Sequence, residues 1–285
     1  MRGEDLLSML REAGAAWSAD HAASMGAALS YYAAFSLAPL LIIVIGLAGV
    51  LFGRDAAQTA IFDELATLVG VEGARAAASL LERAPGDSAG LWATVLGAAT
   101  LLVGATSVFA ELQADMDRIW RAPPPPGFGI LHFLRTRLLS FGVILALTFL
   151  LLVSLLVSAG LAAFARWWGA WFAETQTLLQ ALNFLVSAAI TSVLFAVIYK
   201  WLPRVRMAWR DVWGGAVFTA LLFSVGKLVL GIYLGRSGVA AGFGAAGSLV
   251  VIMVWVYYSA QIFLLGAEFT RVYAHRHGSR QGAPN

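Results

Sequence analysis

The sequence has 285 residues, of which 60% are hydrophobic and 12% charged, whereas an average soluble domain is about 25% charged. This balance excludes a disordered chain, which needs low hydrophobicity and high charge, and a water-soluble enzyme, which needs a more polar surface. The formal net charge is +3 and there is no cysteine, which excludes disulfide bonds and thiolate metal sites. We therefore expect a protein whose main solvent is lipid.

Long stretches without Asp, Glu, Lys or Arg divide the chain into candidate membrane spans. A transmembrane helix needs about 20 mostly apolar residues. Five stretches of this length are uninterrupted, and a sixth is broken only by Lys227. None has the form of a signal peptide, whose apolar region is only ~7–15 residues long. The predicted fold class is an all-α polytopic membrane protein with six transmembrane helices, at approximately 27–52, 89–111, 138–164, 179–200, 212–234 and 247–270.

The distribution of Lys and Arg predicts the orientation of these spans. Thirteen of the 19 basic residues fall on the side that holds both termini, and five fall on the other side. Because cytoplasmic loops retain Lys and Arg, both termini are expected in the cytoplasm, and the basic charge requires no nucleic-acid partner. Residues 1–273 are then expected to form a single six-helix domain, followed by a disordered cytoplasmic tail at 274–285.

Two segments outside the spans have the apolar spacing of helices. Residues 4–17 place Leu6, Leu7, Leu10 and Trp17 on one stripe, which is typical of a helix lying in the membrane interface. The outer loop 54–87 has the pattern of two short amphipathic helices with a break at residues 70–73. This helix pair is expected either to pack at the interface or to form a lid over the bundle.

Three segments in chain order carry a family resemblance. They are AALSYYAAFSLAPL at 27–40, GATSVFAELQADMDRIW at 104–120, and residues 247–269, which include Trp255, Tyr257 and the run LLGAE at 264–268. Together they are similar to the YihY/virulence factor BrkB family of bacterial inner-membrane proteins, over about residues 20–273. The resemblance implies a multi-pass protein of the cytoplasmic membrane surrounded by membrane lipids. One departure is Asp117, where we expect Asn in many relatives.

Many members of that family carry an old ribonuclease label, which the residues argue against. Hydrolysis of RNA with metal ions requires a cluster of His, Asp or Glu around the ions. The four histidines here are scattered, and most acidic residues lie in outer or interfacial segments. There is also no Gly-x-x-x-x-Gly-Lys-Ser/Thr nucleotide motif. We therefore expect no enzyme activity, no metal and no cofactor, and any transport would need an ion gradient, a partner or the gradient of the substrate.

Polar residues inside the spans are the candidates for a binding site, because they are costly in lipid unless they face protein or water. The rise of 1.5 Å per residue places one group in the cytoplasmic half of the first, second and sixth spans, where it is expected to line a cavity. Its members are Tyr31, Tyr32, Ser36, Glu111, Gln261 and Glu268. Helix packing alone is the alternative for most of them. An ion pair is the alternative for Glu268, with Arg271, and for Glu111, with Arg118 through Asp115.

Two further residues stand out along the spans. Pro39 is expected to kink the first span. Lys227 lies about 24 Å along its helix, and it either extends its stem outward to the interface or places a cation inside the bundle, where it would meet an acidic partner or an anionic headgroup.

Two classes of function are consistent with this pattern. The first is a transporter or flippase for a lipid or another amphiphile, which the polar stripes and the deep cation favour. The second is a scaffold or envelope-integrity factor that binds protein partners through its outer loop or tail. The substrate and the oligomeric state are not encoded in any motif that we recognise.

Overall fold

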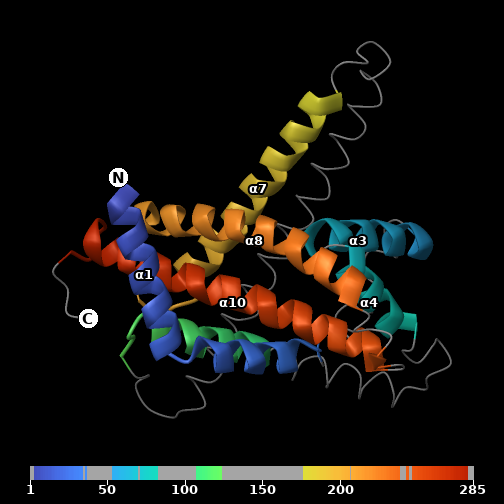
Figure 1. Ribbon diagram of the computed structural model, residues 1–285, viewed down its shortest axis with the longest axis horizontal. Coiled ribbons are helices and arrows are strands. Elements are labelled where there is room, and N and C mark those ends of the chain that lie inside the picture. Colours follow the sequence, from blue (N-terminus) through green and yellow to red (C-terminus); the bar gives the residue numbers. More distant parts are fainter. Residues whose placement is uncertain are drawn as a thin grey trace. The chain divides into compact units, whose positions relative to one another are not determined.

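The computed structural model describes residues 3–34, 36, 53–69, 71–82, 107–123, 176–205, 207–237, 242–243 and 246–281, and all regular structure within these residues is helical. The helices are α1 (Gly3–Ala19), α3 (Arg54–Val69), α4 (Val71–Glu82), α7 (Gln176–Trp201), α8 (Trp209–Ser237) and α10 (Gly247–Arg276), drawn in Figure 1. Residues 22–34 and 107–119 are also helical. The predicted all-α class is confirmed for the described chain.

Three of these helices are long and apolar enough to cross a membrane. Their candidate spans are Phe184–Trp201, Trp209–Leu234 and Gly247–Arg276, which match the spans expected at 179–200, 212–234 and 247–270. Only the ends of the first two expected spans, at 27–34 with residue 36 and at 107–111, fall within the described residues. The span expected at 138–164 lies outside them. The total of six spans and the orientation of the termini therefore stay predictions.

The chain forms two compact units. Unit 1 comprises Met1–Ala13, Met116–Leu222 and Gly266–Asn285, and unit 2 comprises Gly14–Asp115 and Phe223–Leu265. Helices α1, α8 and α10 contribute residues to both units.

Helix α8 exposes a continuous apolar stripe along its length. Most of its exposed large hydrophobic residues follow one side of the helix: Trp213, Val217, Leu221, Val225, Leu228, Val229 and Ile232. A helix of a water-soluble protein places such a stripe in the core. Exposure of this stripe is what a helix surrounded by lipid requires, because lipid tails are as apolar as the side chains themselves.

The connection between α7 and α8 is short and rich in aromatic and basic side chains. Trp201, at the end of α7, makes an edge contact with Trp209, at the start of α8, and their ring centroids are 6.2 Å apart. Lys200 donates a hydrogen bond to the carbonyl of Met207 and lies 5.7 Å from the centroid of the Trp209 ring. Tryptophan and basic residues are enriched where spans leave the membrane, so this connection has the composition of a span boundary.

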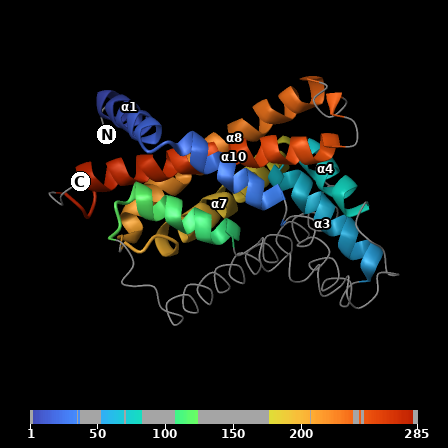
Figure 2. The same cartoon turned by 90° about the horizontal axis from the view of Figure 1, so that it is seen from below.

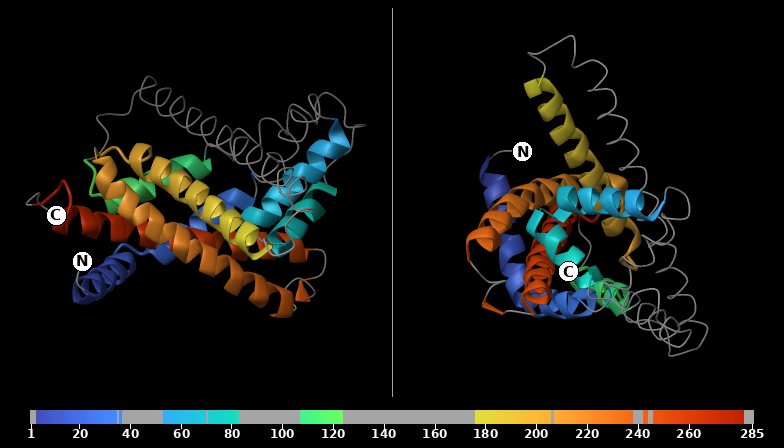
Figure 3. Two further views of the ribbon diagram at one scale, coloured as in Figure 1. Left: turned by 90° about the horizontal axis from the view of Figure 1, so that it is seen from above. Right: turned by 90° about the vertical axis from the view of Figure 1, so that its right-hand side faces the viewer.

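In unit 1 the C-terminal end of α10 packs against α1. The guanidinium of Arg276 donates to the hydroxyl of Ser8 at 2.7 Å and to the carboxylate of Glu12 at 2.5 Å; Figure 3 shows the two helix ends together. The chain continues as turns to residue 281, where the Ser279 N–H donates to the carboxylate of Asp211 at 3.0 Å. The described part of the expected tail is thus attached to both α1 and α8.

In unit 2 the two helices predicted for the outer loop are present. Helix α3 ends at Val69 and α4 begins at Val71, so residues 71–73, expected in the break, instead form the first turn of α4. Both helices pack on the far ends of α8 and α10 (Figures 1 and 2). The buried cluster there consists of Ala76, Ala77, Leu230, Leu234, Val251 and Ile252. Small alanine side chains on α4 allow this close approach.

Candidate functional site

A buried polar layer lies where α7, α8 and α10 meet in unit 1. Tyr199 and Thr219 are fully buried, and their hydroxyl oxygens are 3.0 Å apart. Thr219 donates its single hydroxyl hydrogen to the carbonyl of Gly215 at 2.7 Å. Tyr199 must therefore donate to Thr219, because each hydroxyl has one hydrogen to give.

The crossing of α8 and α10 beside this layer is reciprocal. A Cβ added at Gly215 of α8 would overlap the side chain of Thr270 on α10, and a Cβ added at Gly266 of α10 would overlap the side chain of Thr219 on α8. Thr270 also repeats the local bond of Thr219, because its hydroxyl donates to the carbonyl of Gly266, four residues earlier, at 2.6 Å. Each helix thus carries a glycine and a threonine one turn apart, and each glycine faces the threonine of the other helix.

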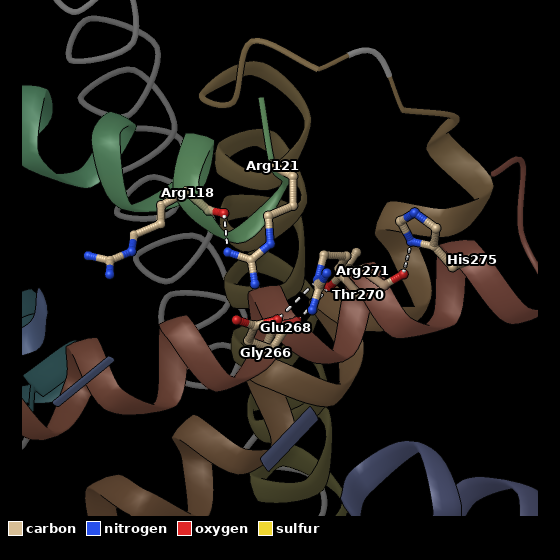
Figure 4. Close-up of polar contacts among 7 residues, drawn as sticks. All are labelled: Arg118, Arg121, Gly266, Glu268, Thr270, Arg271 and His275. Carbon is tan, nitrogen blue, oxygen red and sulfur yellow. Dashed lines mark hydrogen bonds and ion pairs between the residues drawn. The ribbon is translucent and has the colours of Figure 1, made fainter. Parts of the chain in front are cut away.

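Glu268 is the buried acid of this region. Its exposure is 0%, and the Nε of Arg271 donates to its Oε2 at 3.2 Å (Figure 4). The ring Nδ1 of His275 lies 2.9 Å from the carbonyl of Arg271. The Glu268–Arg271 ion pair expected from the i,i+3 spacing is therefore confirmed. The expected cavity at Glu268 stays a prediction.

Arg121 adopts an unusual backbone conformation just after the helical residues 107–119. Its φ is 49°, the N–H of Ala122 donates to the carbonyl of Asp117 at 2.8 Å, and the N–H of Arg121 donates to that of Arg118 at 3.1 Å. This pair of bonds defines a Schellman motif, in which glycine normally occupies the left-handed position. An L-residue there costs about 1–2 kcal/mol relative to the right-handed helical conformation.

The side chain of Arg121 turns toward α10. In Figure 4 its guanidinium extends toward the stretch that carries Glu268 and Arg271, while the guanidinium of Arg118 extends to the other side. One nitrogen of Arg121 is 3.4 Å from the carbonyl of Arg118. Arg118 and Arg121 are both exposed. Two guanidinium groups, of Arg121 and Arg271, are thus directed toward one buried carboxylate.

Asp117, near the end of the helical residues 107–119, contacts the connection between α7 and α8. Its Oδ1 accepts the backbone N–H of Arg204 at 2.8 Å, and its Oδ2 is 3.2 Å from the Nε of Arg204. Burial raises the pKa of the Asp117 carboxyl above its ordinary value, while this hydrogen bond and the positive charge of Arg204 act in the opposite direction.

Most of the other predicted site residues belong to unit 2. The rings of Tyr31 and Tyr32 meet edge to face with centroids 5.7 Å apart, and Tyr31 is 54% exposed. Ser36 is buried, and its hydroxyl donates to the carbonyl of Ala33 at 3.1 Å. Glu111 is half-buried. Because Glu268 belongs to unit 1, the expectation that all six residues line one cavity stays a prediction. Pro39 lies outside the described residues.

Gln261 joins α10 to the helical residues 22–34. Its Nε2 donates to the carbonyl of Ala22 at 3.4 Å, and a Cβ added at Gly26 would overlap the same amide group. Gln261 thus makes an interhelical contact within unit 2. Such a contact is what helix packing alone predicts for this residue.

Lys227 lies on the side of α8 opposite the exposed apolar stripe. A helix with 3.6 residues per turn places three buried residues on the same side as Lys227. They are Ala220, seven positions before it, and Leu230 and Leu234, three and seven positions after it. Lys227 itself is half-buried. Lys227 therefore lies on the buried side of α8, and whether its head reaches the interface or the bundle interior stays a prediction.

Sequence reasoning missed four residues of this region: Tyr199, Thr219, Thr270 and Arg121. The two threonines had a signal, because Gly-x-x-x-Thr occurs at 215–219 and again at 266–270, and small residues at this spacing mark close helix crossings. Arg121 had none, because its left-handed backbone conformation is not visible in a single sequence.

The model of the family described as virulence factor BrkB matches residues 13–285. A UPF0761 membrane protein of Verminephrobacter eiseniae is 27% identical over 257 residues, covering 88% of this chain and 58% of that protein. A UPF0761 membrane protein of Tolumonas auensis is 30% identical over 184 residues, covering 62% and 56%. UPF0761 membrane protein YihY of Escherichia coli O1:K1 / APEC is 29% identical over 182 residues, covering 62% and 58%.

These relatives are named only as membrane proteins, and the chain spans a little more than half of their length. No solved structure matches the chain. The family match covers nearly the whole sequence and agrees with the three apolar helices of the structure. The chain belongs to the virulence factor BrkB family of membrane proteins.

Proposed function

We propose that the chain transports or flips an amphiphile, such as a lipid, in the bacterial inner membrane. The observation that carries this proposal is the fully buried polar group of Glu268, Thr219, Thr270 and Tyr199 on three apolar, membrane-capable helices. The proposal assigns to this group a role in binding the polar part of the substrate or the ion that drives its movement.

The energetic argument rests on the cost of ionisable residues in membranes. Ionisable side chains within spanning segments are costly and are rare unless they face the bundle interior or pair with one another. Packing alone does not require an acid at position 268, because small apolar residues also let helices approach closely. A Glu268–Arg271 pair on a spanning helix is instead typical of substrate and ion pathways, where such residues pair with one another.

Lys227 supports the same proposal from unit 2. It lies on the buried side of α8, and its cationic head suits the anionic headgroup of a lipid. A scaffold that binds partners through its outer loop or tail, which is the alternative function, needs no cation in this position.

The remaining features of the proposal follow from charge and composition. Both termini face the cytoplasm because thirteen basic residues fall on their side. The chain catalyses no covalent reaction and uses no cofactor, so movement is driven by an ion gradient, by a protein partner in the envelope or by the gradient of the substrate.

The experiment is a lipid translocation assay in proteoliposomes. Purified protein is reconstituted with a fluorescent, NBD-labelled phospholipid, and dithionite quenching measures how fast the label moves between leaflets. We expect faster movement than in protein-free liposomes, and loss of the gain in Glu268→Gln, which removes the charge with little change of volume. Asp55→Asn, at an exposed acid of α3, is the matched control and retains the activity.

Reconstitution efficiency and thermal stability are measured for each variant, so that a folding defect is not mistaken for lost transport. Equal rates in protein-containing and protein-free liposomes for labelled phosphatidylethanolamine, phosphatidylglycerol and phosphatidylcholine would contradict phospholipid movement. Capture of one specific envelope protein by the native membrane complex would then favour the scaffold.

A further inference from the structure

We propose that the connection between α7 and α8 binds the headgroup of an anionic phospholipid, such as phosphatidylglycerol. The binding surface, which we call the connection surface, consists of Lys200, Trp201, Trp209, Arg210 and Trp213, all in unit 1. The inference goes beyond the proposed function, because it concerns a lipid bound at the surface of the protein and stands whether or not the chain transports a substrate.

The first argument is the exposure of three tryptophans. Trp201 is 56% exposed, Trp209 44% and Trp213 41%. One candidate span ends at Trp201 and the next begins at Trp209, while Trp213 is the first residue of the exposed apolar stripe of α8. Tryptophan is enriched at the headgroup level of membranes, because its ring is apolar and its N–H is polar. The three rings are thus placed where lipid headgroups meet acyl chains.

The second argument is the charge of the connection. Residues 200–210 include four basic and no acidic residues. The ammonium of Lys200 donates to the carbonyl of Met207 and lies 5.7 Å from the centroid of the Trp209 ring, which holds it beside the exposed rings. The side chain of Arg210 is 73% exposed, although its Nε lies 4.0 Å from the Oδ1 of Asp211. One cation at the end of α7 and one at the start of α8 thus accompany the tryptophans.

The third argument concerns the kind of lipid. A lysine ammonium has three N–H donors and a guanidinium has five, so both groups can donate to the oxygens of a phosphate. Each basic residue close to an anionic membrane surface strengthens binding by about fivefold. Phosphatidylcholine also carries a phosphate, but its quaternary ammonium offsets the negative charge. The cations of the connection surface therefore favour an anionic headgroup.

The leaflet and the nature of the occupant agree with this chemistry. The distribution of basic residues places residues 200–210 on the expected cytoplasmic side, and the cytoplasmic leaflet carries anionic lipids. A soluble anion would satisfy the two cations and leave the exposed rings in water, whereas a phospholipid covers both. Arg204 of the same connection is not part of the surface, because its Nε lies 3.2 Å from the carboxylate of Asp117.

The test removes both cations in the double variant Lys200→Gln with Arg210→Gln. Glutamine at position 200 keeps an N–H donor for the carbonyl of Met207. The matched control is Arg118→Gln with Arg236→Gln, which removes two charges from exposed residues outside the connection surface. The exchange variant Lys200→Arg with Arg210→Lys retains both charges. Melting temperatures without added lipid show whether each variant is folded.

Binding to the full chain in detergent is measured by native mass spectrometry, with phosphatidylglycerol and phosphatidylcholine of the same acyl chains as probes. We expect the wild type to prefer phosphatidylglycerol, and this preference to fall by about tenfold or more in the double variant. The matched control and the exchange variant should keep the preference. If the double variant does not fold, Arg210→Gln alone carries the test, with an expected fall of about fivefold.

A fluorophore locates the bound lipid. The chain has no native cysteine, so Ala208→Cys, within the connection, can carry a single environment-sensitive label. Its emission should change when phosphatidylglycerol is added, and this response should be lost when Lys200→Gln and Arg210→Gln are combined with it. An unchanged lipid preference in the folded double variant, an equal fall in the matched control, or a label that does not respond to phosphatidylglycerol would overturn the proposal.

Discussion

Gly266 on α10 faces Thr219 on α8 so closely that even one added methyl group would overlap the threonine side chain. The same relationship recurs one turn away with the roles of the helices exchanged, at Gly215 and Thr270. Each threonine bonds to the carbonyl of the glycine on its own helix, so its hydroxyl is satisfied without help from lipid. The crossing therefore places polar groups in the centre of unit 1 without leaving their donors exposed to the membrane.

This crossing predicts a large effect of a small substitution. Gly266→Ala should destabilise the protein by about 1–3 kcal/mol, the usual cost of overpacking a close contact, because the new methyl group would meet Thr219 and the Tyr199 hydroxyl. Thermal unfolding in detergent micelles measures the effect.

The matched control for this prediction is Gly231→Ala on α8. A Cβ at Gly231 meets nothing within 4 Å, so alanine there should be neutral or should stabilise the helix by up to about 1 kcal/mol. Equal melting temperatures for Gly266→Ala and the wild type would show that the crossing is looser than the structure indicates.

Much of the fold could be predicted because its signals are local. The apolar stretches that end at residues 200, 234 and 270 predict α7, α8 and α10 by length alone, since a span needs about 20 apolar residues. Helical spacing of apolar residues predicts α3 from Ile61 and Leu65, and α4 from Ala76 and Leu80. The start of α4 at Val71 was missed, because a glycine such as Gly73 is tolerated in the first turn of a helix.

The site was less predictable because its geometry is not local. The i,i+3 spacing of Glu268 and Arg271 predicts their ion pair correctly. The turn of Arg121 toward α10 depends instead on a left-handed residue and on the packing of separate helices. Likewise, no local pattern indicates that Ser279 meets Asp211, 68 residues away.

The orientation of the chain can be tested by cysteine labelling. The chain has no native cysteine, so each introduced cysteine is labelled without background. Val71→Cys, at an exposed position of α4, should react with a membrane-impermeant maleimide in intact cells. Gln281→Cys, at an exposed position after α10, should react only after the cells are opened. The reverse pattern would place both termini outside the cytoplasm.

Asp117 gives a prediction of pH dependence. Because burial raises its pKa in the folded state, the folded protein binds its proton more tightly than the unfolded chain, and stability falls as pH rises from about 3.9 through the raised value. Asp117→Asn mimics the protonated form and can still accept the N–H of Arg204. The melting temperature of Asp117→Asn minus that of the wild type should therefore be larger at pH 7 than at pH 4. A relative gain that grows as the pH falls would contradict this sign.

Arg204→Gln tests the opposing contribution at the same carboxyl. Removal of the guanidinium, whose Nε lies 3.2 Å from Asp117, should raise the pKa of Asp117 further, because the charge of Arg204 lowers it in the wild type. The carboxyl resonance of Asp117, followed by NMR with selective ¹³C labelling, should titrate at higher pH in this variant. A shift to lower pH would show that the two groups do not interact as the structure indicates.

The old ribonuclease label gives a further prediction. Among the described residues, no three His, Asp or Glu side chains are grouped so that they could hold a metal ion, and hydrolysis of RNA by metal ions needs such a group. Purified protein should therefore cleave a labelled RNA no faster than the triple variant Glu111→Gln, Asp115→Asn, Asp117→Asn. Cleavage that copurifies with the wild type and is lost in the triple variant would restore the ribonuclease assignment.

The contact between Asp211 and Ser279 carries the last prediction. Asp211 is fully buried in the first turn of α8, and its Oδ2 accepts both the backbone N–H of Ser279 at 3.0 Å and the hydroxyl at 2.5 Å. Hydrogen bonds to a charged group contribute about 1.5–3 kcal/mol each. Ser279→Ala removes one of the two bonds and should lower the free energy of unfolding by up to this amount. Gln281→Ala, at an exposed residue whose Nε2 donates to the carbonyl of Arg276 at 2.6 Å, should cost less, because that bond is exposed and joins two uncharged groups.

A double-mutant cycle separates this contact from general disturbance of the tail. Asp211→Asn should destabilise on its own, and combining it with Ser279→Ala should cost less than the sum of the single changes, because residues in contact typically couple by about 0.5–3 kcal/mol. Truncation after Arg276 removes Ser279 together with its turn, and so removes both bonds to Asp211; the loss should exceed that seen in Ser279→Ala. Strict additivity of Asp211→Asn and Ser279→Ala would mean that the tail is not held by Asp211.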